Sequence, residues 1–193
     1  MHTLILNGSP RAGGDTMALI GALTDLLPGQ VDRVDAYRAD IRPCVDCRYC
    51  WTHPGCCVRD GWQALDAQIR AADNLVIASP LYFSQLTGPL LSLLSRAQSY
   101  YTARRFQGQP LIDKSKRGGI VLVGGGDGKP DPARDTAASV LRILGARRIG
   151  PLALAHRTNH LPAAQDPEAA AQVAALGAFL RGGDHPSRTR AAT

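Results

Sequence analysis

The segment Thr3–Leu27 reads TLILNGSPRAGGDTMALIGALTDLL and joins two different hydrophobic patterns through a glycine-rich turn. Thr3–Asn7 is a short apolar run, as expected of a strand that is buried on both faces. From Thr16 to Leu27 the apolar residues recur at helical spacing instead. A strand joined to a helix by a short turn is the building unit of a parallel sheet covered by helices.

The rest of the chain repeats this alternation. Further strands are predicted at Val31–Tyr37, Asn74–Pro80, Gly118–Gly126 and Arg147–Ala155, and further helices at Trp62–Asp73, Gly88–Thr102, Ala133–Ala146 and Pro167–Leu180. The pattern predicts an α/β fold with a doubly wound parallel sheet and helices on both faces. Ligands of such sheets lie beyond the carboxyl ends of the strands, so we expect the site in the loops after the first, third and fourth strands.

The length of 193 residues is enough for one domain with a sizeable core. We expect a single domain over residues 1–181 with a cysteine-rich loop insertion at 41–60, and a flexible tail at 182–193. The net charge of +6 is spread along the chain, so no nucleic-acid partner is expected. Residues 1–7 do not resemble a signal peptide, and two prolines interrupt the longest nearly uncharged stretch, 74–95. We therefore expect a cytoplasmic protein without a membrane partner.

The loop after the first strand, Asn7–Thr16, reads NGSPRAGGDT. Its glycines allow close approach of the backbone, and Ser9, Thr16 and the first helical amides can donate hydrogen bonds to a phosphate, while Arg11 supplies positive charge. The loop lacks the GK[ST] ending of a Walker loop and the GxGxxG pattern of dinucleotide-binding proteins. The alternative is an ordinary turn in which Thr16 or Asp15 caps the helix.

The loops after the third and fourth strands suit a flat ring. In SPLYFSQLTGPL, Ser79–Leu90, aromatic side chains follow the end of a strand and offer an apolar surface beside backbone amides. The alternative places Leu81 and Phe83 in the core and Tyr82 on the surface. In VGGGDGKPDP, Val123–Pro132, the glycines indicate close approach to a ligand, and the alternative is a plain flexible turn.

These three loops resemble those of the flavodoxin-like NAD(P)H-dependent FMN reductases, over about residues 3–154. The resemblance implies a five-stranded sheet in the order 2-1-3-4-5, FMN as cofactor, NAD(P)H as co-substrate, a small-molecule electron acceptor and a homodimer or homotetramer. It implies FMN contacts at Ser9, Arg11, Gly14, Asp15, Thr16, Pro80, Leu81, Tyr82, Phe83, Gly124, Gly125 and Gly126. Asp15 departs from the Asn or Ser usual there, and an acidic group beside a phosphate is unfavourable unless it points away.

All five cysteines lie in RPCVDCRYCWTHPGCCVRD, Arg42–Asp60. Cys44, Cys47 and Cys50 are spaced C-x2-C-x2-C, and either Cys57 or Cys56 follows as a fourth thiol. Such dense runs resemble the cluster loops of ferredoxins more than zinc sites, which use two separated pairs.

The run also resembles that of the iron-sulfur flavoproteins, a branch of the same fold, which implies a 4Fe-4S cluster on Cys44, Cys47, Cys50 and Cys57, with Cys56 as the alternative fourth ligand. It equally resembles the PC-x-x-C-x-x-CW wording of plain flavin reductases that need no cluster. In that case the loop would lie on the substrate side or at a subunit contact, with Trp51 near the flavin.

The expected activity is hydride transfer from nicotinamide to FMN and on to a small acceptor, with the flavin and no catalytic side chain performing the chemistry. The sequence contains no Ser-His-Asp order, no paired carboxylates and no HExxH motif. His156 and His160 could form a metal pair, but their surroundings favour a surface loop. The alternative function is an iron-sulfur electron carrier.

Overall fold

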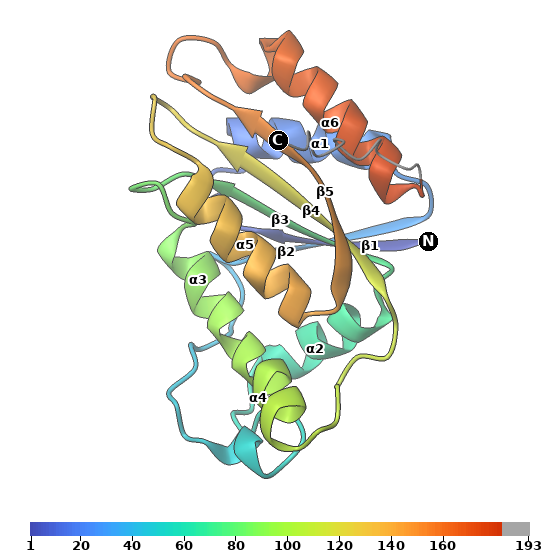
Figure 1. The fold of residues 1–193 in the computed structure, drawn as a ribbon. Coiled ribbons are helices and arrows are strands. Elements are labelled where there is room, and N and C mark those ends of the chain that lie inside the picture. The colour runs from blue at the N-terminus through green and yellow to red at the C-terminus, as the bar shows by residue number, and fades with distance from the viewer. Residues whose placement is uncertain (183–193) are drawn as a thin grey trace, which may run out of the picture.

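The centre of the molecule is one five-stranded parallel sheet with the order β2-β1-β3-β4-β5 (Figure 1). The computed structural model describes residues 1–182. Its strands are β1 (His2–Asn7), β2 (Gln30–Asp35), β3 (Asn74–Pro80), β4 (Lys116–Val123) and β5 (Ala146–Ala155). The α/β flavodoxin-like fold and its strand order are therefore confirmed.

Helices cover both faces of the sheet (Figure 1). They are α1 (Asp15–Asp25), α2 (Trp62–Ala71), α3 (Gly88–Leu94), α4 (Gln98–Phe106), α5 (Asp131–Ile143) and α6 (Pro167–Leu180), with the short turns η1 (Tyr49–Trp51), η2 (Ser95–Ala97) and η3 (Ala163–Gln165). Buried residues of α1 and α6 share one hydrophobic cluster, and those of α2, α3, α4 and α5 share the other.

The two clusters explain why the strands read as continuous apolar runs. In β1, Leu4 and Leu6 belong to the cluster beneath α2 and α3, whereas Ile5 belongs to the cluster beneath α1 and α6. Successive side chains of a strand point to opposite faces, so a sheet covered on both sides needs apolar residues at every position. The sheet thereby fixes the carboxyl ends of the strands as a rigid edge.

The predicted helix Gly88–Thr102 is interrupted in the structure. It divides into α3, the turn η2 and α4, which runs on to Phe106. Ser95 lies at the break, where its hydroxyl donates to the Ser92 carbonyl and accepts a hydrogen bond from the Cys44 amide. A serine hydroxyl that bonds back to the preceding turn competes with the helical pattern, which accounts for the tighter turn there.

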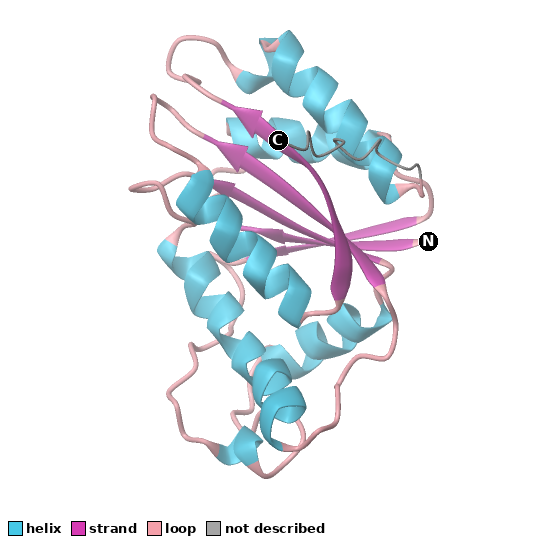
Figure 2. Cartoon of the chain, viewed as in Figure 1, coloured by secondary structure: helices cyan, strands magenta, loops and turns pink. Residues whose placement is uncertain are grey.

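The predicted fourth strand ends earlier than expected, at Val123, so its terminal glycines belong to the following loop. These glycines pair with the loop after β5, as described below, instead of continuing the ladder. The long connection between β2 and α2 contains only η1 as regular structure (Figure 2). The predicted tail at 182–193 lies, apart from Gly182, outside the described residues. Within residues 1–182 no helix is long and apolar enough to cross a membrane.

Candidate functional site

The loop after β1 leads into a helix whose first turn is open. Gly14 is the N-cap of α1 and no side chain caps it, so the alternative with Asp15 or Thr16 as cap is wrong. The first amides of a helix have no partner within the helix and attract anions. Arg11 is exposed beside them, and the Ser9 hydroxyl lies between the Arg11 amide and carbonyl, at 3.4 and 3.3 Å. The arrangement leaves amides and a guanidinium free for an anion.

The carboxylate of Asp15 is engaged elsewhere. Its Oδ1 accepts a hydrogen bond of 2.9 Å from the amide of Ala163 in η3. This contact ties the start of α1 to the connection between β5 and α6. Asp15, whose negative charge is unfavourable beside a phosphate, therefore has its carboxylate held by a backbone amide instead. Thr16 follows it in the first turn and is buried.

Buried polar side chains hold the β1 loop against its neighbours. The Asn7 side chain accepts from the Ser9 amide at 2.9 Å and donates to Asp35 of β2 at 2.8 Å. Burial alone would raise the pKa of Asp35, but the hydrogen bonds from Asn7 and Arg33 outweigh it and lower the pKa below its ordinary value. The carboxylate thus stays charged and fixes the loop from the side of β2.

On the side of β3, the loop touches the segment that precedes α3. The Thr87 hydroxyl donates to the Gly8 carbonyl at 2.9 Å, and the Thr87 amide donates to Ser79 Oγ at 3.2 Å. A Cβ on Gly8 would lie 2.7 Å from Thr87 Oγ1 and 2.8 Å from Leu90 Cδ2, closer than real Cβ contacts. Only glycine allows the two loops to meet.

The loop after β3 ends in a tight turn that exposes two aromatic rings. The amides and carbonyls of Tyr82 and Gln85 pair across the turn, and Phe83 and Ser84 have φ of +53° and +61°. Two consecutive positive φ angles are those of a type I′ turn, which normally takes Asn or Gly. Phe83 is 102% exposed and Tyr82 46% exposed, so the alternative that places Phe83 in the core is wrong. Leu81, by contrast, packs against the core cluster.

The glycines after β4 approach another loop of the protein. The carbonyls of Gly124 and Gly125 accept hydrogen bonds from the amides of Thr158 and Asn159, at 3.1 and 3.3 Å. A Cβ on Gly125 would lie 2.9 Å from the Asn159 side chain, whereas one on Gly126 would meet nothing within 4 Å. The sequence predicts that these glycines approach a ligand, but in the structure part of their close approach is to the loop after β5.

The same pairing places His156 and His160 on the loop after β5, as the sequence favours. Nδ1 of His156 is buried without a hydrogen-bond partner. A Cβ on Gly124 would lie 3.4 Å from that nitrogen and 3.4 Å from Leu81. The loops after β3, β4 and β5 therefore meet at one place, and Pro80, the last residue of β3, directly precedes the first of them.

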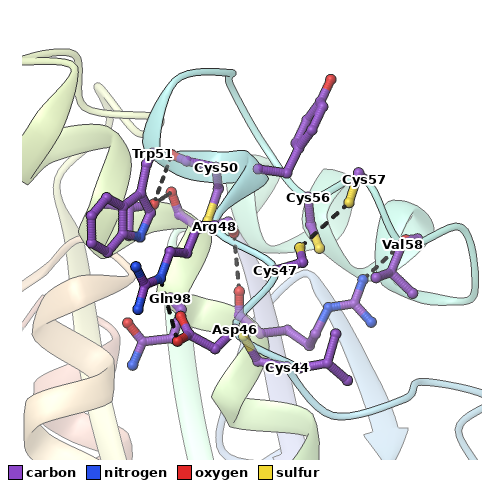
Figure 3. Close-up of a pocket in the computed structure, with 15 residues that line it drawn as sticks. Cys44, Asp46, Cys47, Arg48, Cys50, Trp51, Cys56, Cys57, Val58 and Gln98 are labelled. Carbon is purple, nitrogen blue, oxygen red and sulfur yellow. Dashed lines mark hydrogen bonds and ion pairs between the residues drawn. The ribbon is translucent and has the colours of Figure 1, made fainter.

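The structure brings all five cysteines to a single pocket between the connection after β2 and the helices η2 and α4 (Figure 3). The pocket has a volume of about 50 Å³, enough for a few waters. The Ser95 hydroxyl holds the Cys44 amide at 2.9 Å, and Thr102 and Gln107 hold the Cys50 carbonyl at 3.0 and 2.8 Å. The backbone on both sides of Cys47 is thus fixed by α4 and its preceding turn.

Arg96, which lines this pocket, belongs to a buried ion pair. Arg96 and Asp60 have side chains that are 0% and 3% exposed, with a nitrogen–oxygen distance of 2.8 Å. The guanidinium also donates to the carbonyls of Arg42 and Val58, at 2.9 and 3.1 Å, so it joins the two ends of the cysteine loop. Its Nε remains buried without a hydrogen-bond partner, while the Cys56 thiol lies close enough to interact electrostatically.

The thiols themselves differ in their surroundings. Cys47 and Cys57 are exposed, with their sulfurs 3.6 Å apart, and Cys56 packs against the hydrophobic cluster (Figure 3). Hydrogen bonds from the Tyr49 amide and from Cys57 lower the pKa of Cys47. The hydrogen bond between Cys57 and Cys47 raises the pKa of Cys57. Within residues 1–182, no three His, Cys, Asp or Glu side chains are arranged as a ready metal cage.

Trp51 lies at the rim of the cysteine pocket and stacks on Phe106 of α4, with ring centroids 4.5 Å apart, while the Arg48 guanidinium lies over its indole. The sequence did not reveal the supporting residues Arg96 and Asp60. A lone arginine in the apolar helix Gly88–Thr102 was the available signal, but its partners are distant in sequence.

Comparison with solved structures shows the same fold. An NAD(P)H:quinone oxidoreductase from Methanothermobacter marburgensis superposes with a TM-score of 0.68 at 16% identity, covering 96% of this chain and 99% of that one. An azoreductase from Bacillus anthracis gives a TM-score of 0.64 at 15% identity, covering 93% and 98%. At such identities the likeness establishes the architecture alone.

Comparison with curated proteins finds iron-sulfur flavoproteins. One from Archaeoglobus fulgidus is 26% identical over 153 residues, which cover 78% of this chain and 66% of that protein. Another, from Methanosarcina thermophila, is 28% identical over 95 residues, 48% of this chain and 50% of that protein. This chain thus spans between half and two thirds of the length of these relatives.

A model of the family described as NADPH-dependent FMN reductase matches residues 1–160, which include the sheet, the three carboxyl-end loops and the cysteine pocket. This protein belongs to the NADPH-dependent FMN reductase family.

Proposed function

We propose that this protein is an FMN-dependent NAD(P)H oxidoreductase that reduces a small acceptor such as a flavin or a quinone. The observation that carries the proposal is the meeting, at one edge of the sheet, of an uncapped helix start, two exposed aromatic rings and a glycine loop. FMN has an anionic phosphate at one end and a flat ring at the other, joined by a ribityl chain. Family membership and the reductases among the structural neighbours agree with this assignment.

The phosphate of FMN would be held by the amides at the start of α1, the Ser9 hydroxyl and the Arg11 guanidinium. The loop fits a dianion because its amides are uncapped and the Asp15 carboxylate is bound to Ala163. Gly14 lets the Arg11 side chain lie close, since a Cβ there would be 3.2 Å from Arg11 Nε. Thr16 would contribute its amide, because its side chain is buried in the first turn.

The ring of FMN would lie against Tyr82, Phe83 and the backbone of Gly124–Gly126. Exposed aromatic side chains on a constrained turn offer an apolar surface at little cost in side-chain entropy. When bound, FMN supplies the ability to accept a hydride from a nicotinamide and to pass electrons to an acceptor. The protein's own contribution is to bind and orient the ring, and we assign no catalytic side chain.

The proposal extends to a single FMN-binding domain over residues 1–181 that works as a homodimer or homotetramer. The exposed rings of Tyr82 and Phe83 are consistent with a neighbouring subunit closing the pocket. Aromatic side chains left bare on a monomer are common at subunit interfaces.

Reconstitution with FMN followed by anaerobic titration with NADPH or NADH tests the activity. We expect the flavin absorbance to bleach and to return when a quinone is added. The matched variants are Arg11→Gln and, on the opposite edge of the sheet, Arg147→Gln. Losing a charge-assisted hydrogen bond to phosphate costs about 1.5–3 kcal/mol, so Arg11→Gln should weaken FMN binding by about tenfold or more, and Arg147→Gln should not.

Two results would count against the proposal. A protein that takes up no FMN would refute the flavin site itself. A protein that binds FMN but is bleached by neither nicotinamide would refute the reductase activity while leaving the flavin site intact.

The second candidate is an electron carrier with a 4Fe-4S cluster, and the observation that favours it is the gathering of five free cysteines around one pocket. The donor set fits, because thiolates are the usual ligands of such clusters, although the thiols form no closed cage as they stand. Cys44, Cys47, Cys50 and Cys57 would hold the cluster, which would supply one-electron transfer. Iron and sulfide analysis with an anaerobic spectrum tests this, and iron-free protein after reconstitution would contradict it.

A further inference from the structure

We propose that Cys47 and Cys57 form a reversible disulfide and so make an oxidative modification site on the cysteine pocket. Their sulfurs are 3.6 Å apart, and both residues are exposed to solvent. A disulfide requires the sulfurs to approach to about 2.05 Å, so a movement of about 1.5 Å joins them. Exposure gives a small oxidant access to both.

The backbone presents the two thiols to each other. Asp46 and Arg48, on either side of Cys47, have φ of +49° and +60°, and Gly55, just before Cys56 and Cys57, has φ of +78°. Residues other than glycine rarely adopt this conformation, and the fold must hold them there. The tight turn directs Cys47 outward while the Ser95 and Thr102 hydroxyls fix the chain on both sides of it.

The other cysteines do not offer the same pairing. The sulfur–sulfur hydrogen bond in the pocket joins Cys47 to Cys57. Cys56, although it precedes Cys57 directly, packs against the hydrophobic cluster beside Arg96. The structure thus distinguishes between neighbours that the sequence alone presents as equivalent.

The oxidant is a hydroperoxide. One thiol attacks the peroxide oxygen, the O–O bond breaks, and a sulfenic acid forms with release of water or alcohol. The second thiol then attacks the sulfenic sulfur, the sulfenic oxygen leaves as water, and the S–S bond is made. The two thiols lose two electrons and two protons, and the peroxide is reduced. A thiol reductant reverses the reaction by exchange.

This pairing has a consequence that rests on the proposed cluster. Cys47 and Cys57 are two of its four expected ligands, and a disulfide sulfur is not a thiolate ligand. The oxidised loop would therefore not accept the cluster, and a loop that holds the cluster would be protected from forming this disulfide. Oxidation would decide which of the two states the pocket adopts.

The test uses the 193-residue chain, which is first reduced and then desalted in the absence of oxygen. It is next treated with hydrogen peroxide, and the remaining free thiols are alkylated. Trypsin cuts after Arg38, Arg48 and Arg59, so Cys47 falls in the peptide 39–48 and Cys57 in the peptide 49–59. We expect these peptides to be joined in the mass spectrum, and to separate after reduction. The link should be lost in Cys47→Ser and in Cys57→Ser.

Cys56→Ser is the matched control, because it removes a thiol from the adjacent position and should keep the link. Absence of the linked peptides, or a link that survives Cys57→Ser and is lost in Cys56→Ser, would overturn the proposal. Thermal unfolding of each variant checks that it is folded, and Cys57→Ala serves as a second variant if Cys57→Ser is not. Iron uptake is measured separately, so failure of the cluster leaves the disulfide result intact.

Discussion

The proposed flavin edge, made of the loops after β1, β3, β4 and β5, and the cysteine pocket are both built on loops, but the fold holds them in different ways. At the flavin edge the loops are joined to each other by backbone hydrogen bonds, such as those from Thr158 and Asn159 to the glycines after β4. At the cysteine pocket a long connection is held by side chains from η2 and α4, chiefly the buried Arg96. The first arrangement requires the backbones of two loops to approach closely. The second requires the side chain of Arg96, which is distant in sequence from the loop that it holds.

This difference shows where each region is vulnerable. The flavin edge should be sensitive to added atoms, since its loops are in van der Waals contact at glycines. The cysteine pocket should be sensitive to lost charge, since the buried carboxylate of Asp60 has its shortest ion pair with the Arg96 guanidinium.

The largest expected effect is on the cysteine pocket. Arg96→Met should lower the free energy of unfolding by about 3–5 kcal/mol, because it removes the shortest ion pair of the buried Asp60 carboxylate, which then keeps only the Arg42 Nε at 3.7 Å and two backbone amides. Arg105→Met, at an exposed site on α4, which follows η2 directly, should change it by less than about 0.5 kcal/mol. Urea denaturation measures both. Equal, small effects of the two substitutions would show that the ion pair does not hold the loop.

The next effect is on the flavin edge. Gly8→Ala places a methyl group against Thr87 and Leu90, and we expect a loss of about 1–3 kcal/mol in the free energy of unfolding, with weaker FMN binding. Gly21→Ala is the control, because a Cβ at that helical position meets nothing within 4 Å. It should stabilise the protein by about 0.5–1 kcal/mol. Destabilisation by both would mean that close contact at Gly8 is not the cause.

A smaller effect, of opposite sign, is expected at the aromatic turn. Ser84→Gly should raise the free energy of unfolding by about 0.5–1 kcal/mol, because glycine adopts positive φ without the strain of a side chain. Ser92→Gly, inside α3, should lower it by a similar amount. Thermal unfolding distinguishes the two, and a destabilised Ser84→Gly would contradict the conformation of this turn.

The smallest effect concerns acid stability. Burial would raise the pKa of Asp60, but hydrogen bonds from Arg96 and from the Trp62 and Arg42 amides outweigh it and lower the pKa, as Asn7 and Arg33 do for Asp35. A lowered folded-state pKa gives stability that is present above the unfolded pKa of about 4 and lost as pH falls through the folded value.

Unfolding curves between pH 6 and pH 3, the range of about one to two units around the unfolded pKa, measure this loss. Asp60→Asn should reduce the loss of unfolding free energy at low pH more than Asp35→Asn does. The reason is that the side chain of Asp60 is 3% exposed and that of Asp35 is 20% exposed. The reverse order would show that the flavin edge, and not the cysteine pocket, carries the acid sensitivity.

Much of the fold was predictable because its signals are local. The βα alternation gave the parallel sheet, and α6 was predicted at its observed bounds, Pro167–Leu180. The break at Ser95 was missed because its hydroxyl is shared with Cys44, which lies far away in sequence. The sequence did not settle whether Phe83 is exposed, because an apolar ring beside a strand normally predicts burial.

The sequence by itself determined the architecture, the three loops at the carboxyl ends of the strands and the gathering of the cysteines in one segment. These features depend on hydrophobic period and on residues close together in the chain. Only the tertiary structure decided that the Asp15 carboxylate bonds to Ala163, that Arg96 and Asp60 support the cysteine loop, and that Cys47 faces Cys57. Each of these depends on a contact between distant segments, because a side chain acquires its partner, its burial and its charge state only when the sheet and its helices have assembled.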